Sequence, residues 1–146
     1  MIEVRNLHKG FNGEEILKGI STTFDRGKTN LIIGTSGSGK TVFLKCLLGL
    51  FTPEQGAISY DGSIYSELNE QQQRDLREQM GMVFQGSALF DSMTVEENVM
   101  FPLMMFTHQK KEEMLERVHE VLDRVNLENA EKKLPSEISG GMQKRV

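Results

Sequence analysis

One eight-residue stretch, GTSGSGKT at residues 34–41, restricts the fold more than any other feature of this chain. It matches G-x-x-x-x-G-K-[ST] in full, with an apolar segment before it and an amphipathic segment after it. Small residues let successive backbone N–H groups turn towards an anion, and a following helix directs the positive end of its dipole at the same point. The stretch therefore predicts a strand, a phosphate-binding loop (P-loop) and a helix that together bind a nucleoside triphosphate.

Individual residues of the P-loop suit different parts of that ligand. Lys40 supplies a point charge for the β- and γ-phosphates, and Thr41 supplies a hydroxyl for Mg²⁺, a cation that takes oxygen ligands. A glycine-rich connection without a ligand is the alternative, and the strand–loop–helix context speaks against it. The candidate nucleotide-binding residues are Gly34, Thr35, Ser36, Gly37, Ser38, Gly39, Lys40, Thr41 and Val42.

Composition narrows the class further. The 146 residues suffice for one globular domain with its own core, and a net charge of −4 argues against nucleic acid as a partner. Cys46 is the single cysteine, so no internal disulfide can form; a buried reduced thiol is the favoured interpretation and a reactive thiol the alternative. The first residues lack the apolar region of a signal peptide. The longest apolar run, Val99–Phe106, is far shorter than the ~20 residues that span a bilayer.

Apolar periodicity predicts an α/β core followed by a helix-rich second half. Two helix starts carry capping boxes, Asn69 with Gln72 and Thr94 with Glu97. The expected strands are residues 2–7, 16–25, 28–34, 57–60 and 80–84, of which 28–34 and 80–84 are expected to be buried. The expected helices are residues 40–51, 69–79, a segment opening at 94, and 109–125.

The helix expected at residues 109–125 has the clearest pattern. Its outer face carries the pairs Glu113–Arg117 and Glu120–Arg124, with acid preceding base by four positions, the favourable order. These charges are interpreted as a solvated surface. Its apolar face consists of Met114, Val118, Val121, Leu122 and Val125.

Three longer stretches resemble the ATP-binding domain of ABC transporters, in the order found in that family. They are the opening EVRNLHKGFNGEEILKGIS, the Q-loop region MGMVFQGSALFDSMTVEENV, and LPSEISGGMQKRV, which is similar to the signature motif usually written LSGGQ. The wording GSALFDSMTVEENVMFPL and SEISGGMQKRV is closest to Mla-type phospholipid-trafficking ATPases, which work with MCE-domain proteins. Amino-acid uptake importers are the nearest competitors.

The resemblance implies a P-loop NTPase core of ABC type with a helical subdomain, truncated before the Walker B strand. Residues 1–86 would form the nucleotide-binding core, and residues 87–146 the Q-loop exit and the helical subdomain that ends at the signature motif. Hydrolysis in this family needs a strand ending in Asp-Glu and a later His, and neither follows the signature motif in these residues. The family protein is therefore expected to be an ATPase, while residues 1–146 alone are expected to bind Mg-ATP weakly without turning it over.

Residue roles follow from the same resemblance. Phe11 would stack on adenine, with packing at the sheet edge as the alternative. Gln85 would join Lys40 as a catalytic residue, approaching Mg²⁺ and the attacking water, and the alternative is a hydrogen bond to a loop. Ser139, Gly140 and Gly141 would contact the γ-phosphate bound by a second copy, although Ser-Gly-Gly alone indicates only a helix start.

Two departures from the family pattern lie in the signature motif. Ile138 replaces Leu, a conservative change, and Met142 stands where most members have Gln, which puts the hydrogen bonding behind the motif in doubt.

Partners also follow from the resemblance. They are a second ATPase subunit, transmembrane permease subunits docking near Val99–Phe106 (or else packing of the helical subdomain there), and an MCE-type lipid-binding protein. The implied location is cytoplasmic, peripheral on the inner face of the membrane. A non-hydrolysing module that uses nucleotide for dimerisation is the second functional hypothesis.

Overall fold

The computed structural model describes residues 1–84 and 86–146. The chain divides into two compact units, Met1–Gly81 and Met82–Val146, and each unit has a buried apolar cluster of its own. The resemblance predicts a functional boundary near residue 86, between the nucleotide-binding core and the Q-loop exit, and this boundary stays a prediction.

The first unit is built on an antiparallel sheet with the strand order β2-β1-β3-β4. Its strands are β1 (Ile2–Phe11), β2 (Glu14–Phe24), β3 (Gln55–Tyr60) and β4 (Ser63–Ile64). The β1–β2 hairpin turns through Asn12 and Gly13, whose φ angles of 52° and 82° are those of the two-residue turn that matches strand twist. A second Asn/Asp-Gly turn, at Asp61–Gly62, joins β3 to β4. The strands expected at 2–7, 16–25 and 57–60 are confirmed.

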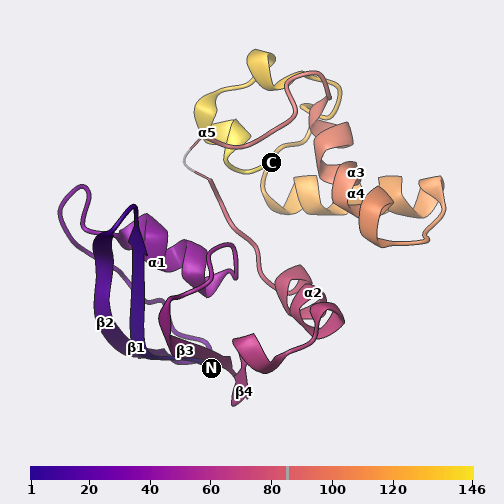
Figure 1. Ribbon diagram of the computed structural model, residues 1–146. Coiled ribbons are helices and arrows are strands. Elements are labelled where there is room, and N and C mark those ends of the chain that lie inside the picture. Colours follow the sequence, from indigo (N-terminus) through magenta and orange to yellow (C-terminus); the bar gives the residue numbers. More distant parts are fainter. Residues whose placement is uncertain (85) are drawn as a thin grey trace. The chain divides into compact units, whose positions relative to one another are not determined.

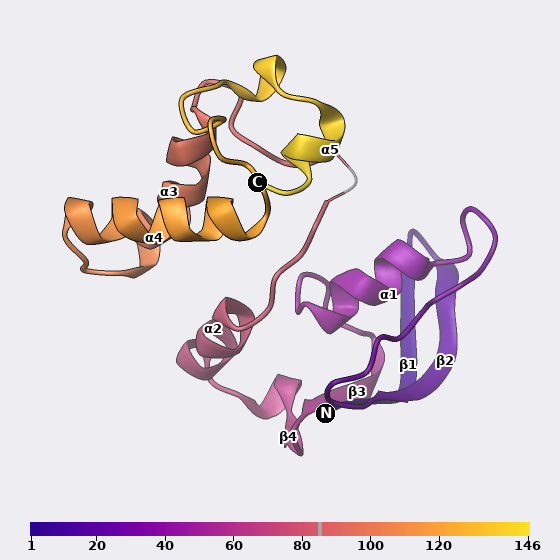
Figure 2. The ribbon, with the colours of Figure 1, turned by 180° about the vertical axis from the view of Figure 1, so that it is seen from behind.

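Helix α1 (Lys40–Leu47) packs on one face of this sheet (Figure 1), and the view from behind agrees (Figure 2). Its buried residues are Phe43, Cys46 and Leu47, spaced so that they share one side of the helix. They pack against strand residues Val4, Leu7, Leu17, Ile58 and Tyr60. Leu44 and Leu50 are 42% and 52% exposed.

The rest of the first unit is the 3₁₀ turn η1 (Tyr65–Glu67) and helix α2 (Glu70–Glu78). The capping box of α2 is confirmed, because Gln72 N donates to Asn69 Oδ1 at 2.9 Å and Asn69 N donates to Gln72 Oε1 at 3.0 Å.

Two predictions of buried strands are wrong. Residues 28–34 and 80–84 form no strand, and Leu31, Ile33 and Val83 are 85%, 81% and 74% exposed. The reason is that a strand exists only when neighbouring strands pair with its N–H and C=O groups. Among residues 1–84, the four-stranded sheet places no partner beside residues 28–34.

The second unit is helical. It contains α3 (Val95–Phe106), α4 (Lys111–Arg124), the 3₁₀ turn η2 (Pro135–Glu137) and α5 (Gly140–Gln143). The capping box of α3 is confirmed, with Thr94 N donating to Glu97 Oε2 at 2.8 Å and Glu97 N donating to Thr94 Oγ1 at 3.3 Å. The buried cluster consists of Val95, Met100, Val118, Leu122, Leu127, Ala130 and Ile138.

Helix α4 confirms the expected apolar face, since Val118 and Leu122 are buried. Of the two expected charge pairs, Glu120–Arg124 forms. Arg117 pairs with Glu120 rather than with Glu113, because the Glu113 carboxylate accepts a hydrogen bond from Lys110 N at 2.9 Å. One acid therefore serves two bases.

Membrane crossing finds no support in the described helices. Across residues 1–84 and 86–146, none of them reaches the length and apolar character that a bilayer crossing requires.

Candidate functional site

The P-loop connects the extended segment 28–33 to α1. Residues 34–38 are exposed, while Gly39 and Lys40 are half-buried. Gly39 precedes the helix with a φ of 90°, and its carbonyl accepts the hydrogen bond of Phe43 N at 2.8 Å. The strand on its N-terminal side is missing, but the loop leads directly into α1 as the motif predicts. The backbone of residues 34–38 is therefore accessible to a ligand.

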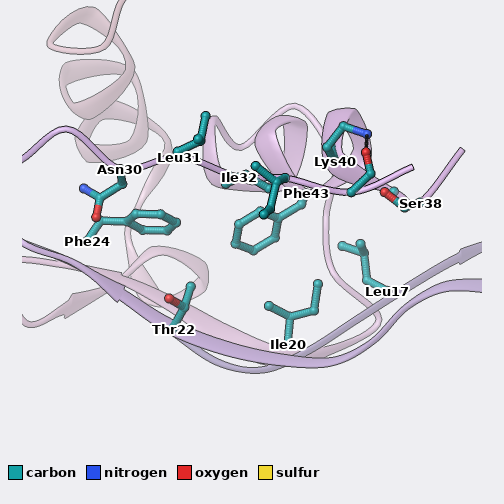
Figure 3. Close-up of a pocket in the computed structure, with 13 residues that line it drawn as sticks. Leu17, Ile20, Thr22, Phe24, Asn30, Leu31, Ile32, Ser38, Lys40 and Phe43 are labelled. Carbon is teal, nitrogen blue, oxygen red and sulfur yellow. Dashed lines mark hydrogen bonds between the residues drawn. The ribbon is translucent and has the colours of Figure 1, made fainter. Parts of the chain in front are cut away.

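Lys40 lies over this loop. Its Nζ donates to the carbonyl oxygens of Gly34 at 2.8 Å and Thr35 at 2.7 Å, and Figure 3 shows the Lys40 side chain at one end of the adjacent pocket. The side chain thus returns across the turn and places its positive charge beside the exposed backbone. Thr41, the next residue, is exposed at the start of α1, so its hydroxyl is accessible. One ammonium and one hydroxyl are therefore available at the N-terminal end of an eight-residue helix.

A pocket of about 440 Å³ lies beside the loop, between β2 and the segment 30–34. Figure 3 shows Leu17, Ile20 and Thr22 on one side, Leu31 and Ile32 on the other, and Lys40 and Ser38 at one end. Because most of these walls are apolar, the pocket does not suit a charged phosphate chain. The exposed P-loop at its rim carries the chemistry for phosphate.

Phe11 lies at the end of β1 and is 38% exposed. Its ring meets the Phe51 ring edge-on with centroids 5.2 Å apart, and Lys9 Nζ lies 5.0 Å from its centroid. It also borders a pocket of about 200 Å³ formed by the β1–β2 turn and Glu54. Phe11 therefore packs at the sheet edge and keeps part of its ring accessible, and its stacking on adenine stays a prediction.

The Ser-Gly-Gly segment begins α5 in the second unit. Ser139 is its N-cap, with Oγ accepting from Met142 N at 3.3 Å, which confirms the helix start that Ser-Gly-Gly indicates. Ser139, Gly140 and Gly141 are all exposed, whereas Ile138 before them is buried. The contact of this segment with a second copy's phosphate stays a prediction. Gln85 lies outside the described residues.

Two polar side chains of the helical unit, Asn98 and Gln143, make hydrogen bonds that were not predicted from the sequence. Asn98 on α3 accepts from Phe90 N at 2.8 Å and donates to the carbonyls of Phe90, Met93 and Thr94 at 2.9–3.1 Å. Gln143 on α5 joins Pro135 and Ser87, with contacts of 2.8 and 3.0 Å. In the sequence, only the departure from the family pattern at the preceding residue, Met142, drew attention to hydrogen bonding at this place.

A third polar side chain, Glu96, forms a partly buried ion pair that was also missed. Its side chain is 10% exposed, and both carboxylate oxygens accept from Lys132 Nζ, at 2.8 and 2.9 Å. The hydrogen bonds from Lys132, with a smaller contribution from His119, lower the pKa of the Glu96 carboxyl below its usual range. Glu96 stabilises the helical unit, and nothing connects it to a ligand.

Three further titratable side chains, Cys46, His8 and His119, are also buried or in contact with other side chains. Cys46 is a free, buried thiol, as predicted, and its burial raises the pKa of the thiol. His8 contacts Glu15 at 2.6 Å, and His119 lies 3.5 Å from Glu96. Over the ranges 1–84 and 86–146, no three His, Cys, Asp or Glu side chains gather as a metal site.

The family model described as ABC transporter matches residues 17–146. The chain belongs to the ABC transporter ATP-binding family. Its mixed α/β fold is that of the ABC cassette.

Three relatives carry different names, two of which state a transported compound. The chain is 42% identical over 145 residues to the probable ribonucleotide transport ATP-binding protein mkl of Mycobacterium bovis. It is 39% identical over 151 residues to a probable amino-acid ABC transporter ATP-binding protein of Haemophilus influenzae. It is 40% identical over 147 residues to the chloroplastic protein trigalactosyldiacylglycerol 3 of Arabidopsis thaliana. The matches cover 99–100% of this chain but only 40%, 59% and 42% of those proteins.

Two solved structures share the fold. A dimeric bacterial ABC transporter cassette matches with a TM-score of 0.87 and 30% identity, over 99% of this chain and 66% of that one. A dimeric post-hydrolysis cassette bound to ADP and Pi matches with a TM-score of 0.85 and 29% identity, over 99% of this chain and again 66% of that one.

Proposed function

We propose that the full-length protein is the ATPase subunit of an ABC transporter, which couples ATP binding and hydrolysis to transport across a membrane. The observation that carries this proposal is the position of Lys40. Its ammonium lies over an exposed GTSGSGKT loop at a helix start, in a chain of the ABC family. The structural relative bound to ADP and Pi supports ATP as the nucleotide.

The roles within the nucleotide site follow the motif. The loop and Val42 hold the phosphates, Lys40 neutralises the charge of the β- and γ-phosphates, and Thr41 offers its hydroxyl to Mg²⁺. The exposed loop backbone and the accessible Thr41 hydroxyl fit these groups. Gln85 positions the attacking water and contacts Mg²⁺, and Phe11 stacks on adenine through the accessible part of its ring. Bound Mg²⁺ would supply charge stabilisation at the transferred phosphoryl group.

A second copy completes the site in this proposal. Ser139, Gly140 and Gly141 contact the nucleotide held by the other subunit's P-loop, and their exposure leaves them accessible for that contact. The dimeric cassettes among the structural relatives support a two-subunit arrangement.

The permease subunits dock on α3 in this account. Met104, Met105 and Phe106, at the C-terminal end of the helix, are 61%, 61% and 63% exposed. Flexible methionine side chains suit an adaptable apolar contact. Packing inside the helical unit accounts for Val95 and Met100 but not for these three residues. Docking would hold the protein at the inner face of the membrane.

We propose phospholipid as the transported compound. The motif wording around residues 86–103 supports it, and so does the lipid term in the name of the Arabidopsis relative. An MCE-type lipid-binding partner follows only from this proposal, since none of the relatives described above is named for one. Amino-acid uptake is the second candidate, supported by the Haemophilus relative.

The test uses the full-length protein reconstituted with its permease in vesicles. ATP hydrolysis is measured for wild type, for Lys40→Ala and for Lys28→Ala, an exposed lysine outside the P-loop. We expect turnover by wild type and Lys28→Ala and at least a hundredfold loss in Lys40→Ala, the scale of one transition-state charge contact. ATP-dependent dimerisation without any hydrolysis would instead favour the nucleotide-dependent dimerisation module.

The same vesicles identify the transported compound. ATP-dependent transfer of a fluorescent phosphatidylglycerol, without uptake of radiolabelled methionine, supports phospholipid transport. Uptake of the amino acid alone would overturn it.

A further inference from the structure

The side chain of Gln143 bridges two segments of the helical unit. Its Nε2 donates to the carbonyl of Pro135 at 2.8 Å, and its Oε1 accepts from Ser87 Oγ at 3.0 Å. Both contacts are partly buried. Both ends of one amide are therefore used, one on the turn η2 before the signature motif and one on the segment that follows Gln85.

The segment that Gln143 holds is conformationally strained. Ser87 and Ala88 have φ angles of 57° and 56°, a left-handed conformation that costs a non-glycine residue about 1–2 kcal/mol. Two adjacent residues of this kind persist only where surrounding contacts fix them. The Ser87 hydroxyl is held by Gln143 on α5, and Asn98 on α3 holds Phe90 further along. The segment is thus fixed to two helices.

We propose that Gln143 is a positioning residue that fixes residues 86–88 and the Ser-Gly-Gly segment in one arrangement, so that the two segments move as one. This inference rests on the proposed ATPase function, in which the first segment adjoins Gln85 and the second meets the other subunit's phosphate. Gln143 contacts neither ligand itself.

The arrangement also explains the Met142 departure. Met142 packs against the apolar cluster of the helical unit, and its thioether lacks the amide through which a glutamine would hydrogen-bond. Its neighbour Gln143 is half-buried, and its amide reaches Pro135 and Ser87 from the next position of the helix. Hydrogen bonding behind the motif is therefore present, one residue later than the family pattern places it.

The test is a double-mutant cycle in the full-length protein with Ser87→Ala, Gln143→Met and both changes together. Methionine keeps the length of glutamine but removes both hydrogen bonds. Gln143→Glu keeps the acceptor for Ser87 and loses only the donor to Pro135. Gln71→Met is the matched control, because Gln71 on α2 bonds only its exposed neighbour Asp75. Turnover, KM for ATP and ATP affinity are measured for each protein.

We expect Ser87→Ala and Gln143→Met each to lower kcat about fivefold, the equivalent of one hydrogen bond. The double variant should be no worse than Gln143→Met alone, because that change already removes the Ser87 contact. KM and ATP affinity should stay at wild-type values, Gln143→Glu should recover part of kcat, and Gln71→Met should match wild type.

Other outcomes overturn the inference in distinguishable ways. Independent losses of about twenty-fivefold in the double variant, or unchanged kcat in both single variants, would show that the contact does not position the site. A loss of ATP affinity together with a lower melting temperature would indicate a merely structural role. No turnover by wild type would overturn the proposed function, and this inference with it.

Discussion

At the scale of single residues, two P-loop glycines share the same backbone conformation but differ in how closely other atoms surround them. Gly37 and Gly39 both have left-handed φ angles, 81° and 90°. A Cβ at Gly37 would meet nothing within 4 Å, whereas a Cβ at Gly39 would lie 2.9 Å from Ile16 Cγ2. The two positions therefore differ in crowding while sharing the same conformation.

Alanine at each position tests this difference. We expect Gly37→Ala to lower the free energy of unfolding by about 1 kcal/mol through strain alone. Gly39→Ala should lower it by about 2–4 kcal/mol, because overpacking against β2 adds to the strain. Urea unfolding without nucleotide measures both, and equal losses would show that α1 does not lie as close to β2 as described.

Phe11 offers a second test at the same scale. Alanine there should weaken ATP binding about fivefold to a hundredfold, the range of base stacking on an aromatic ring, while Phe11→Trp should retain affinity. The unfolding free energy should fall as well, because most of the ring is covered and it packs edge-on against Phe51. If Phe11→Ala lowers stability and leaves ATP affinity unchanged, the ring serves edge packing with Phe51 only.

At the scale of elements, helices were predictable and isolated strands were not. The capping boxes at Asn69 and Thr94 depend on residues three positions apart, so the sequence contains the whole interaction. Hairpin strands were also predictable, because Asn12-Gly13 fixes the turn locally. Segments 28–34 and 80–84 read as buried strands, but a strand's hydrogen bonds come from distant partners that a local pattern cannot supply.

The candidate site divides in the same way. The P-loop and the helix start at Ser-Gly-Gly are local motifs and were found from the sequence. The Gln143–Ser87 contact spans 56 positions and the Glu96–Lys132 pair spans 36, so only the folded chain brings these residues together.

The ion pair of Glu96, at the start of α3, should make the free energy of unfolding depend on pH. Its pKa is lowered in the folded state, so the pair contributes stability above the unfolded pKa of about 4.5 and loses it as pH falls through the lower folded value. We expect Glu96→Gln to lower the unfolding free energy by about 1–2 kcal/mol at pH 7, with the difference from wild type shrinking below about pH 4.5. Denaturant unfolding at pH 7, 5 and 3.5 measures it. A difference that stays constant with pH would contradict the ion pair, and Glu116→Gln on exposed α4 surface serves as the control.

At the scale of the whole molecule, the two functional segments lie in different units, the P-loop in Met1–Gly81 and Ser139–Gly141 in Met82–Val146. Our account joins each P-loop to the Ser-Gly-Gly segment of a second copy. With a slowly hydrolysed ATP analogue and Mg²⁺, the full-length protein should therefore double its mass in light scattering, and with ADP it should not.

Gly140→Asp gives this prediction a specific control. The position has open space around it, so the variant should fold, while its carboxylate would repel a facing phosphate. We expect it to bind nucleotide as a monomer. A dimer that forms equally well in Gly140→Asp would exclude this segment from the interface.

The central claim is that the P-loop binds ATP through Lys40, and calorimetric titration of Mg-ATP into the full-length protein tests it most directly. Wild type and Lys28→Ala should bind with equal affinity, and Lys40→Ala at least tenfold more weakly, because a charge-assisted contact worth about 1.5–3 kcal/mol is lost. Binding by Lys40→Ala that equals wild type, or no binding by wild type, would contradict the account.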